Sequence, residues 1–217
     1  MRAAGLCEDN DLRYSRNALM PKTVDYYFTP ASPWTYLGHS RFAQMIARSS
    51  ALVNVKPVDY GRIFPVSGGL PLKQRAPQRQ AYRLIELRRW REHLGLPLNL
   101  EPKHFPYATE LASSMIIAAD RLHGAPRAMQ LAYDIMQACW VRERNCAEPE
   151  TLDQIAAAAG MDGPSLRARE DEAKAAYAAY TQEAIERQVF GAPSYVLNGE
   201  IFWGQDRLDF VERALTR

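Results

Sequence analysis

The stretch Asp25-Tyr-Tyr-Phe-Thr-Pro-Ala-Ser32-Pro-Trp-Thr-Tyr-Leu37 decides how this chain folds. It begins as a short apolar strand and continues through a turn, after which Ser32 can cap a helix whose first residue is Pro33. The first N–H groups of a helix have no intrahelical partner, and the helix dipole places partial positive charge beside them. We therefore expect a strand, a helix and, between them, a turn that can hold an anion such as a thiolate or a carboxylate.

The composition is that of an ordinary globular protein. Of the 217 residues, 47% are hydrophobic and 24% are charged, which is enough for both a substantial core and a well-solvated surface. The formal net charge of +2 is too small to indicate binding to nucleic acid or to an anionic membrane. No apolar run approaches the roughly 18 residues that a membrane span needs. We expect neither nucleic acid nor membrane as a partner.

Residues 1–20 are expected to lie outside the fold. They carry several charges, show no periodicity and lack the apolar segment of a secretory signal. They are either a disordered arm or a mis-assigned start, with Met20 as the true initiator. The folded domain is expected in residues 21–217.

The cysteines and histidines suggest neither disulfides nor a metal. Three cysteines, an odd number, without a secretory signal indicate a reducing compartment, and hence a cytoplasmic protein. Cys139 and Cys146 are seven residues apart, which predicts two free thiols on one face of a helix. The four histidines lack metal-ligand spacing, so no metal site is expected.

Hydrophobic periodicity divides the rest of the chain into three parts. The N-terminal part predicts a strand over 23–28, a helix over 34–47 and a strand over 51–58, followed by a long Gly- and Pro-rich loop over 59–77. The middle part predicts an almost entirely helical insertion at about 79–188. The helices are expected over 79–94, 109–123, 126–144, 148–159 and 163–188.

The C-terminal part returns to strands. Strands are predicted over 192–197 and 200–203, joined by a hairpin at Asn198-Gly199, and an amphipathic helix is predicted over 206–215. The order β-α-β, helical insertion, β-β-α is the topology of a thioredoxin-like α/β fold with a large all-helical insertion. In that fold the proline that opens the third strand, here Pro193, is commonly cis and lies beside the helix start.

The helix start lacks the thiols of redox-active thioredoxin-like proteins. Those proteins carry Cys-x-x-Cys at this point, whereas this chain has Ser32-Pro33-Trp34-Thr35. A dithiol oxidoreductase, the third interpretation, is therefore close to excluded. If a sulfur atom acts here, it must arrive with a ligand.

Four motifs carry a resemblance to a known family over residues 23–216. They are Ser32-Pro33-Trp34-Thr35-Tyr36-Leu37, the stretch from Pro57-Val58 to Ile63-Phe64, Gly191-Ala192-Pro193-Ser194-Tyr195-Val196, and Phe202-Trp203-Gly204-Gln205-Asp206-Arg207-Leu208. The chain resembles the 2-hydroxychromene-2-carboxylate isomerase family, within the DsbA-like and kappa-class glutathione transferase group.

The resemblance implies a cytoplasmic, homodimeric, glutathione-dependent enzyme that acts on a small aromatic substrate. The glutathione thiolate would add reversibly to a conjugated chromene carboxylate, the ring would open, the bond would rotate, and glutathione would be returned as a cofactor. It implies that Ser32 contacts the sulfur and that Trp34 and Gly69 lie near the substrate. The residues that it implies for binding glutathione are Ala192, Pro193, Gln205 and Asp206.

Elementary chemistry supports the role of Ser32 independently. A hydrogen bond from its hydroxyl, together with the helix N–H groups, would favour the thiolate and lower the pKa of a glutathione thiol. The backbone at Ala192 could pair with the tripeptide as an added strand does. Asp206 suits the ammonium of the γ-glutamyl group.

Simpler interpretations of the same residues stay open. Ser32 and Asp206 could be helix caps only, and Trp34 could be an ordinary packing residue. Gly69 stands where many relatives of this family carry an asparagine, so that amide is missing. The alternatives to an isomerase are a kappa-class-like glutathione transferase and a non-catalytic thioredoxin-like domain that binds a partner at the strand opened by Pro193.

Overall fold

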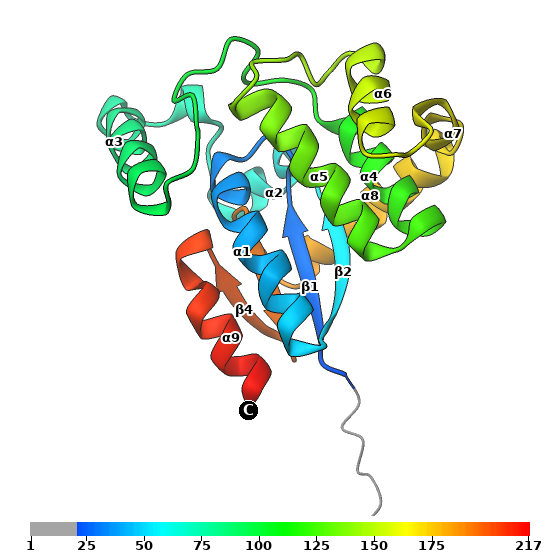
Figure 1. Ribbon diagram of the computed structural model, residues 1–217. Coiled ribbons are helices and arrows are strands. Elements are labelled where there is room, and N and C mark those ends of the chain that lie inside the picture. Colours follow the sequence, from blue (N-terminus) through cyan, green and yellow to red (C-terminus); the bar gives the residue numbers. More distant parts are fainter. Residues whose placement is uncertain (1–20) are drawn as a thin grey trace, which may run out of the picture.

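A four-stranded mixed sheet forms the centre of the molecule (Figure 1). The structure is a computed structural model that describes residues 21–217. The expected N-terminal arm and Cys7 lie outside the described residues. The strand order is β2-β1-β3-β4. Strand β1 (Thr23–Phe28) pairs in parallel with β2 (Leu52–Pro57), whereas β3 (Ser194–Leu197) pairs antiparallel with both β1 and β4 (Glu200–Trp203).

Helices cover both faces of this sheet. Helix α1 (Pro33–Ser49) and helix α9 (Leu208–Thr216) lie on one face, in front of the strands in Figure 1. Helices α2 (Tyr60–Ser67) and α8 (Glu170–Glu186) lie on the other face. The side chains of β1 alternate accordingly, since Tyr26 packs with the α1 side and Tyr27 with the α8 side. This arrangement confirms the predicted thioredoxin-like α/β fold with its helical insertion.

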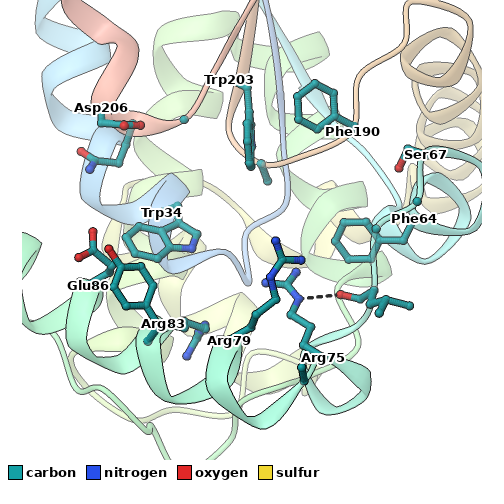
Figure 2. A pocket seen from close by; sticks show the side chains of 18 of the residues that line it. Trp34, Phe64, Ser67, Arg75, Arg79, Arg83, Glu86, Phe190, Trp203 and Asp206 are labelled. Atoms are coloured by element: carbon teal, nitrogen blue, oxygen red, sulfur yellow. Dashed lines mark hydrogen bonds between the residues drawn. The ribbon is translucent and has the colours of Figure 1, made fainter.

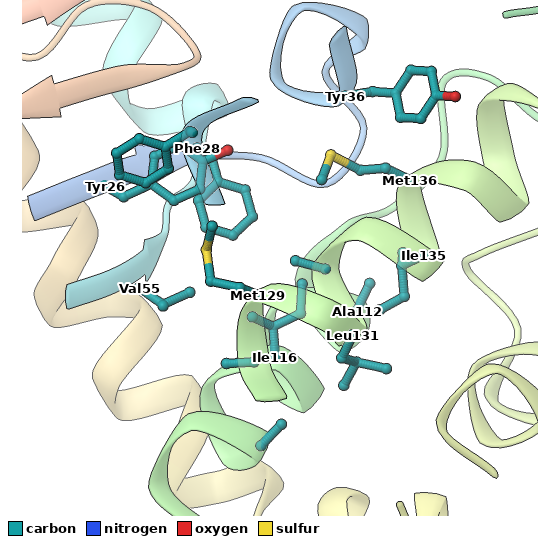
Figure 3. Packing of buried hydrophobic residues seen from close by; sticks show 14 of the residues in the cluster. Tyr26, Phe28, Tyr36, Val55, Ala112, Ile116, Met129, Leu131, Ile135 and Met136 are labelled. Atoms are coloured by element: carbon teal, nitrogen blue, oxygen red, sulfur yellow. The ribbon is translucent and has the colours of Figure 1, made fainter. Parts of the chain in front are cut away.

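The main core joins the sheet to the insertion. Tyr26, Phe28 and Val55 of the strands meet Met129 of α5 and Ile116 of α4, and all five are buried (Figure 3). Tyr26 stacks on Phe28 with ring centroids 4.5 Å apart. The insertion is therefore packed into the same core as the sheet. Its helices are α3 (Pro77–Leu94), α4 (Glu110–His123), α5 (Ala125–Trp140), α6 (Pro149–Ala158), α7 (Gly163–Arg167) and α8.

The segment 59–77, predicted as a loop, is mostly ordered into helix. Helix α2 occupies Tyr60–Ser67, and a short 3-10 turn covers Leu72–Gln74. Asp59 caps α2 by accepting a hydrogen bond from the Gly61 N–H at 2.7 Å, and Ile63 is fully buried against the sheet. The prediction of a loop was wrong because capping and burial outweigh the weak helix propensity of a segment that contains Pro65.

Two other boundaries differ from the prediction. The helix predicted over 163–188 is two helices, because α7 ends at Arg167 and α8 starts afresh with Glu170, Asp171 and Glu172, whose charges suit a helix N-terminus. Helix α5 ends at Trp140. Asn99 donates hydrogen bonds to the carbonyls at this end, from its backbone N–H to Trp140 and from its side-chain amide to Val141. Cys146 therefore lies beyond the helix, contrary to the prediction, and both Cys139 and Cys146 are free and buried.

The last helix also begins later than predicted. Residues Gln205–Arg207 form a 3-10 turn, and α9 proper starts at Leu208 with Arg207 before it. Asp206 is therefore not the N-cap of this helix. The hairpin at Asn198-Gly199 is confirmed, with both residues at positive φ (52° and 84°), as a tight turn between antiparallel strands requires.

Candidate functional site

Two adjoining cavities open where α1 begins. The first, of about 790 Å³, lies between the turn at Trp203–Asp206 and helix α3 (Figure 2). The second, of about 750 Å³, lies between the Ser32 turn, the 3-10 turn at Leu72–Gln74 and the segment around Phe105. Both are of the size that holds a small ligand. The residues lining both cavities are Trp34, Phe64, Arg75, Arg83 and Ala192.

Ser32 caps helix α1 at the wall of the second cavity. Its backbone is extended, and its Oγ accepts a hydrogen bond from the Thr35 N–H at 3.2 Å. A hydroxyl that accepts through a lone pair still has its own proton to donate. Pro33 has no N–H, and the Thr35 N–H is used by the cap, so the Trp34 N–H is the donor left over at this helix start within the described chain. Ser32 and Trp34 thus provide an O–H and an N–H for an anion.

The segment before β3 lies beside this helix start. The Ala192–Pro193 peptide is cis, as the fold predicted. The carbonyl of Gly191 accepts a hydrogen bond from the Tyr60 hydroxyl at 2.7 Å, which fixes the segment to α2, and one from the nearby Ser194 hydroxyl at 2.6 Å. The backbone N–H and C=O of Ala192 have no hydrogen-bond partner among residues 21–217. They are available to pair with an extended peptide.

Gln205 and Asp206 form one wall of the first cavity but contribute different atoms. The Gln205 side chain is buried and accepts a hydrogen bond from the Arg41 guanidinium, which also binds the Gln205 carbonyl at 2.9 Å. Both carbonyl oxygens of Gln205 are therefore engaged, and its N–H groups are what it can offer to a ligand. The Asp206 carboxylate is exposed and pairs with Arg207 at 2.5 Å, so it can accept an ammonium group. Arg41 was not predicted, because nothing local in the sequence links it to residue 205.

Gly69 is covered by an aromatic ring. A Cβ atom built on Gly69 would collide with the ring of Phe64. The position at which relatives were expected to place an amide thus contacts a phenyl side chain, which lines both cavities. Trp34 lines both cavities as well and is partly buried against the core. Figure 2 shows its indole between Asp206 and the arginines of α3.

The scaffold behind α1 contains a buried histidine. His39 contacts the Tyr26 hydroxyl through Nδ1 at 3.1 Å and the Met129 carbonyl through Nε2 at 2.9 Å. Burial lowers the pKa of His39 from 6.5 to about 4, so the ring is neutral at physiological pH. It joins β1, α1 and α5 and faces neither cavity. His39 is a structural residue.

Comparison with known proteins places this geometry in a family. A model of the DSBA-like thioredoxin domain matches residues 23–216. The chain belongs to this family. A 2-hydroxychromene-2-carboxylate isomerase of Sphingobium xenophagum is 27% identical over 199 residues, which cover 90% of this chain and 99% of that protein. The solved structure of a 2-hydroxychromene-2-carboxylate isomerase has a TM-score of 0.75 at 25% identity and covers 90% of this chain and 95% of that one.

A more distant relative is also similar along its whole length. Glutathione S-transferase kappa 1 of Homo sapiens is 22% identical over 209 residues, covering 90% of this chain and 92% of that protein. The resemblance to the isomerase family within the DsbA-like and kappa-class group is thus confirmed. None of the helices described in residues 21–217 is both long enough and apolar enough to cross a bilayer. The homodimer stays a prediction.

The structure brings most of the predicted residues to the two cavities. Ser32 lines the second, Gly69, Gln205 and Asp206 line the first, and Trp34 and Ala192 line both. Pro193 is buried next to Ala192. Sequence reasoning missed the residues on the opposite side, although Arg79 and Arg83 are spaced to share a helix face. The missed residues of that side are Phe64, Arg75, Arg79 and Arg83. Arg41, which binds Gln205 and lines neither cavity, was missed as well.

Proposed function

We propose that the protein is a glutathione-dependent isomerase of 2-hydroxychromene-2-carboxylate-type aromatic compounds. The observation that carries this proposal is the Ser32 hydroxyl, which caps α1 through its lone pair and keeps its proton for a sulfur at the cavity wall. The similarity to proteins named as 2-hydroxychromene-2-carboxylate isomerases over almost their full length supports it.

The residues present fit the cysteinyl and γ-glutamyl parts of glutathione. Ala192 has unpaired backbone donor and acceptor groups, which suit the cysteinyl part of an extended tripeptide. Asp206 can accept from the γ-glutamyl ammonium, and the backbone N–H groups of Gln205 and Asp206, which no described residue accepts from, suit its carboxylate. Because Ala192 lines both cavities and Asp206 only the first, we place the sulfur at the junction, beside Ser32.

Glutathione, when bound, supplies a thiolate nucleophile that can add reversibly to a conjugated acceptor. Ser32 donates its hydroxyl proton in a hydrogen bond to the sulfur, and the Trp34 N–H and the dipole of α1 add positive potential at the same point. These groups favour the charged form and so lower the pKa of the thiol. Ser32 keeps its proton throughout and acts as a hydrogen-bond donor. Phe64 and Phe105 give the second cavity apolar, aromatic walls.

A kappa-class-like glutathione transferase is the second candidate. It is favoured by one observation, the Phe64 ring that covers Gly69 where a side-chain amide was expected. A wall without that amide offers less polar assistance to a ring-opened substrate, whereas simple addition of a thiolate needs only Ser32 and an acceptor. The two candidates share the glutathione site.

Glutathione binding is the first measurement. At 100 times the dissociation constant a ligand adds about 2.7 kcal/mol of stability, which raises the melting temperature of a chain this long by roughly 5–10 °C. We expect this shift in the wild type and in Ser32→Ala, with thiolate absorbance of the bound ligand only in the wild type. Conversion of 2-hydroxychromene-2-carboxylate with glutathione unconsumed then distinguishes the isomerase from a transferase. No shift at millimolar glutathione would leave a non-catalytic binding domain.

A further inference from the structure

Three arginines line the cavities without a carboxylate partner. Arg75 follows the 3-10 turn, and Arg79 and Arg83 lie one turn apart on helix α3. None of them forms an ion pair with an acidic residue of the described chain. Of the nearby acids, Glu86 pairs with Arg89 at 2.7 Å and Asp206 pairs with Arg207. Glu101, which lines the second cavity, attracts Arg83 without forming an ion pair with it. The α3 side of the site therefore has an excess of positive charge.

Arg83 is the most deeply placed of the three. Its Nη2 atom is shielded from solvent and has no hydrogen-bond partner. Its guanidinium lies 5.4 Å from the centre of the Phe105 ring and 5.9 Å from that of Trp140, and these rings hold it in place. Burial and the neighbouring Arg75 lower the pKa of Arg83 to about 10, and it still carries its charge at neutral pH. A buried donor with no acceptor is costly, and such groups cluster at binding sites.

Arg75 is oriented toward the same space. Its Nε donates to the Leu70 carbonyl at 2.8 Å, and its guanidinium lies 5.9 Å from the centre of the Phe64 ring. Figure 2 shows Arg75 and Arg79 reaching into the first cavity from the α3 side, across from Trp203 and Phe190. Arg75 and Arg83 line both cavities, whereas Arg79 lines only the first.

The place of Phe105 indicates which ligand meets Arg83. Arg83 borders both cavities, but Phe105, against which its guanidinium lies, lines only the second. Under the proposed function, on which this inference rests, glutathione occupies the first cavity between Asp206 and Ala192. The second cavity, lined by Ser32, is left for the acceptor. Its wall is largely apolar and aromatic, so a planar conjugated ring fits there, and Arg83 is its buried cation. The larger aliphatic and aromatic residues of that wall include Tyr60, Phe64, Leu72, Leu84, Leu100 and Phe105.

We propose that Arg83, assisted by Arg75, binds an anionic group of the acceptor in the second cavity and selects conjugated aromatic acids over their neutral analogues. The guanidinium presents a planar fork of donors that matches a carboxylate in two parallel hydrogen bonds. Phe105 lies directly beneath it, so the ring of an aryl acid can lie against Phe105 or Phe64 while its carboxylate meets Arg83. Arg83 is thus a specificity-determining residue.

Binding of trans-cinnamate and its methyl ester tests this inference by calorimetry at saturating glutathione. We expect Arg83→Met to weaken cinnamate roughly 10- to 100-fold, because a charge-assisted hydrogen bond is lost, and to leave the ester unchanged. Arg83→Lys should recover part of the loss, since it keeps the charge without the fork. Arg88→Met, on the exposed side of the same helix, is the matched control and should behave as the wild type. Arg75→Met should weaken cinnamate binding by roughly fivefold, and it replaces Arg83→Met as the test if that variant fails to fold.

Several outcomes would overturn the inference. One is equal loss of acid and ester in Arg83→Met, which would mean that Arg83 only packs against Phe105 and Trp140. Another is unchanged cinnamate binding, or none in the wild type. A third is that Arg83→Met binds glutathione more weakly than the wild type does, while both bind the glycine ethyl ester of glutathione equally well. That result would assign Arg83 to the glycine carboxylate. Failure of the proposed function is distinguishable, because it removes glutathione binding from the wild type itself.

Discussion

The two walls of the site are built from different parts of the chain. On the side of Ser32, Ala192 and Gln205, the groups offered to a ligand are mainly backbone atoms and one hydroxyl, and they are fixed by α1 and the sheet. On the side of α2 and α3, the groups are long side chains such as Phe64 and Arg83, held by stacking. The first wall therefore suits one fixed ligand, whereas the second can change its ligand by single substitutions. Glutathione recognition is expected on the first wall and acceptor choice on the second.

The largest effect is expected at Ser32. Ser32→Ala removes the donor to the sulfur, and the loss of one such donor typically costs roughly 10²- to 10³-fold in kcat. It also removes the cap of α1, which costs about 1 kcal/mol of stability. Stopped-flow turnover and the pH dependence of thiolate absorbance measure the two consequences. The control is Ser67→Ala, which changes an exposed serine in the wall of the first cavity. An equal loss of activity there would contradict a special role for Ser32.

The first wall also depends on His39, which joins α1 to β1 and α5. Its pKa is about 4 in the folded protein and about 6.5 when unfolded, so the unfolded chain binds the proton more readily. Stability should therefore be fully present above pH 6.5 and be lost as the pH falls toward 4, by about 3 kcal/mol over that window. Urea unfolding across this range should show a shallower pH dependence in His39→Gln than in His123→Gln, an exposed control on α4. Equal slopes would remove His39 as the cause.

Arg41 positions the Gln205 turn without contacting either cavity. Arg41→Met leaves two acceptors of Gln205 unpaired and should raise the dissociation constant of glutathione roughly three- to tenfold, with kcat at saturation unchanged. Calorimetry measures the affinity. Arg48→Met on the same helix removes only an exposed ion pair with Glu212 and should have no effect. A fall in kcat at saturating glutathione would mean that Arg41 acts on the sulfur and not on the turn.

The smallest effect is expected on the second wall. A methyl group at Gly69 collides with Phe64, so Gly69→Ala should turn this ring and reshape both cavities. The cost in stability is expected to be about 1 kcal/mol. The acceptor KM should change more than the glutathione affinity, since Gly69 and Phe64 belong to the second wall and the groups proposed to bind glutathione belong to the first. If glutathione affinity changed and the acceptor KM did not, the division of the site into two walls would be wrong.

The sequence predicted the first wall better than the second for a physical reason. Ser32-Pro33 and Asn198-Gly199 are local signals, because a helix start and a tight turn are determined by neighbouring residues. Helix α2 was missed because its stability comes from the burial of Ile63 and the Asp59 cap and not from propensity. The partnership of Arg41 with Gln205 joins residues 164 positions apart, and no pattern of spacing predicts such a contact. The arginine cluster likewise exists only once α3 has packed against α1 and Arg75 has come to lie near Arg83.

The two buried thiols have a practical consequence. Burial raises the pKa of Cys139 and of Cys146 to about 12, so neither forms a thiolate near neutral pH. Within residues 21–217 the folded protein therefore presents no reactive sulfur of its own. The third cysteine, Cys7, precedes residue 21 and can be replaced by Cys7→Ser. Electrophilic reagents and thiolate absorbance would then report on added glutathione alone. The folded chain would then serve as a chemically silent background against which the ionisation of its ligand can be followed.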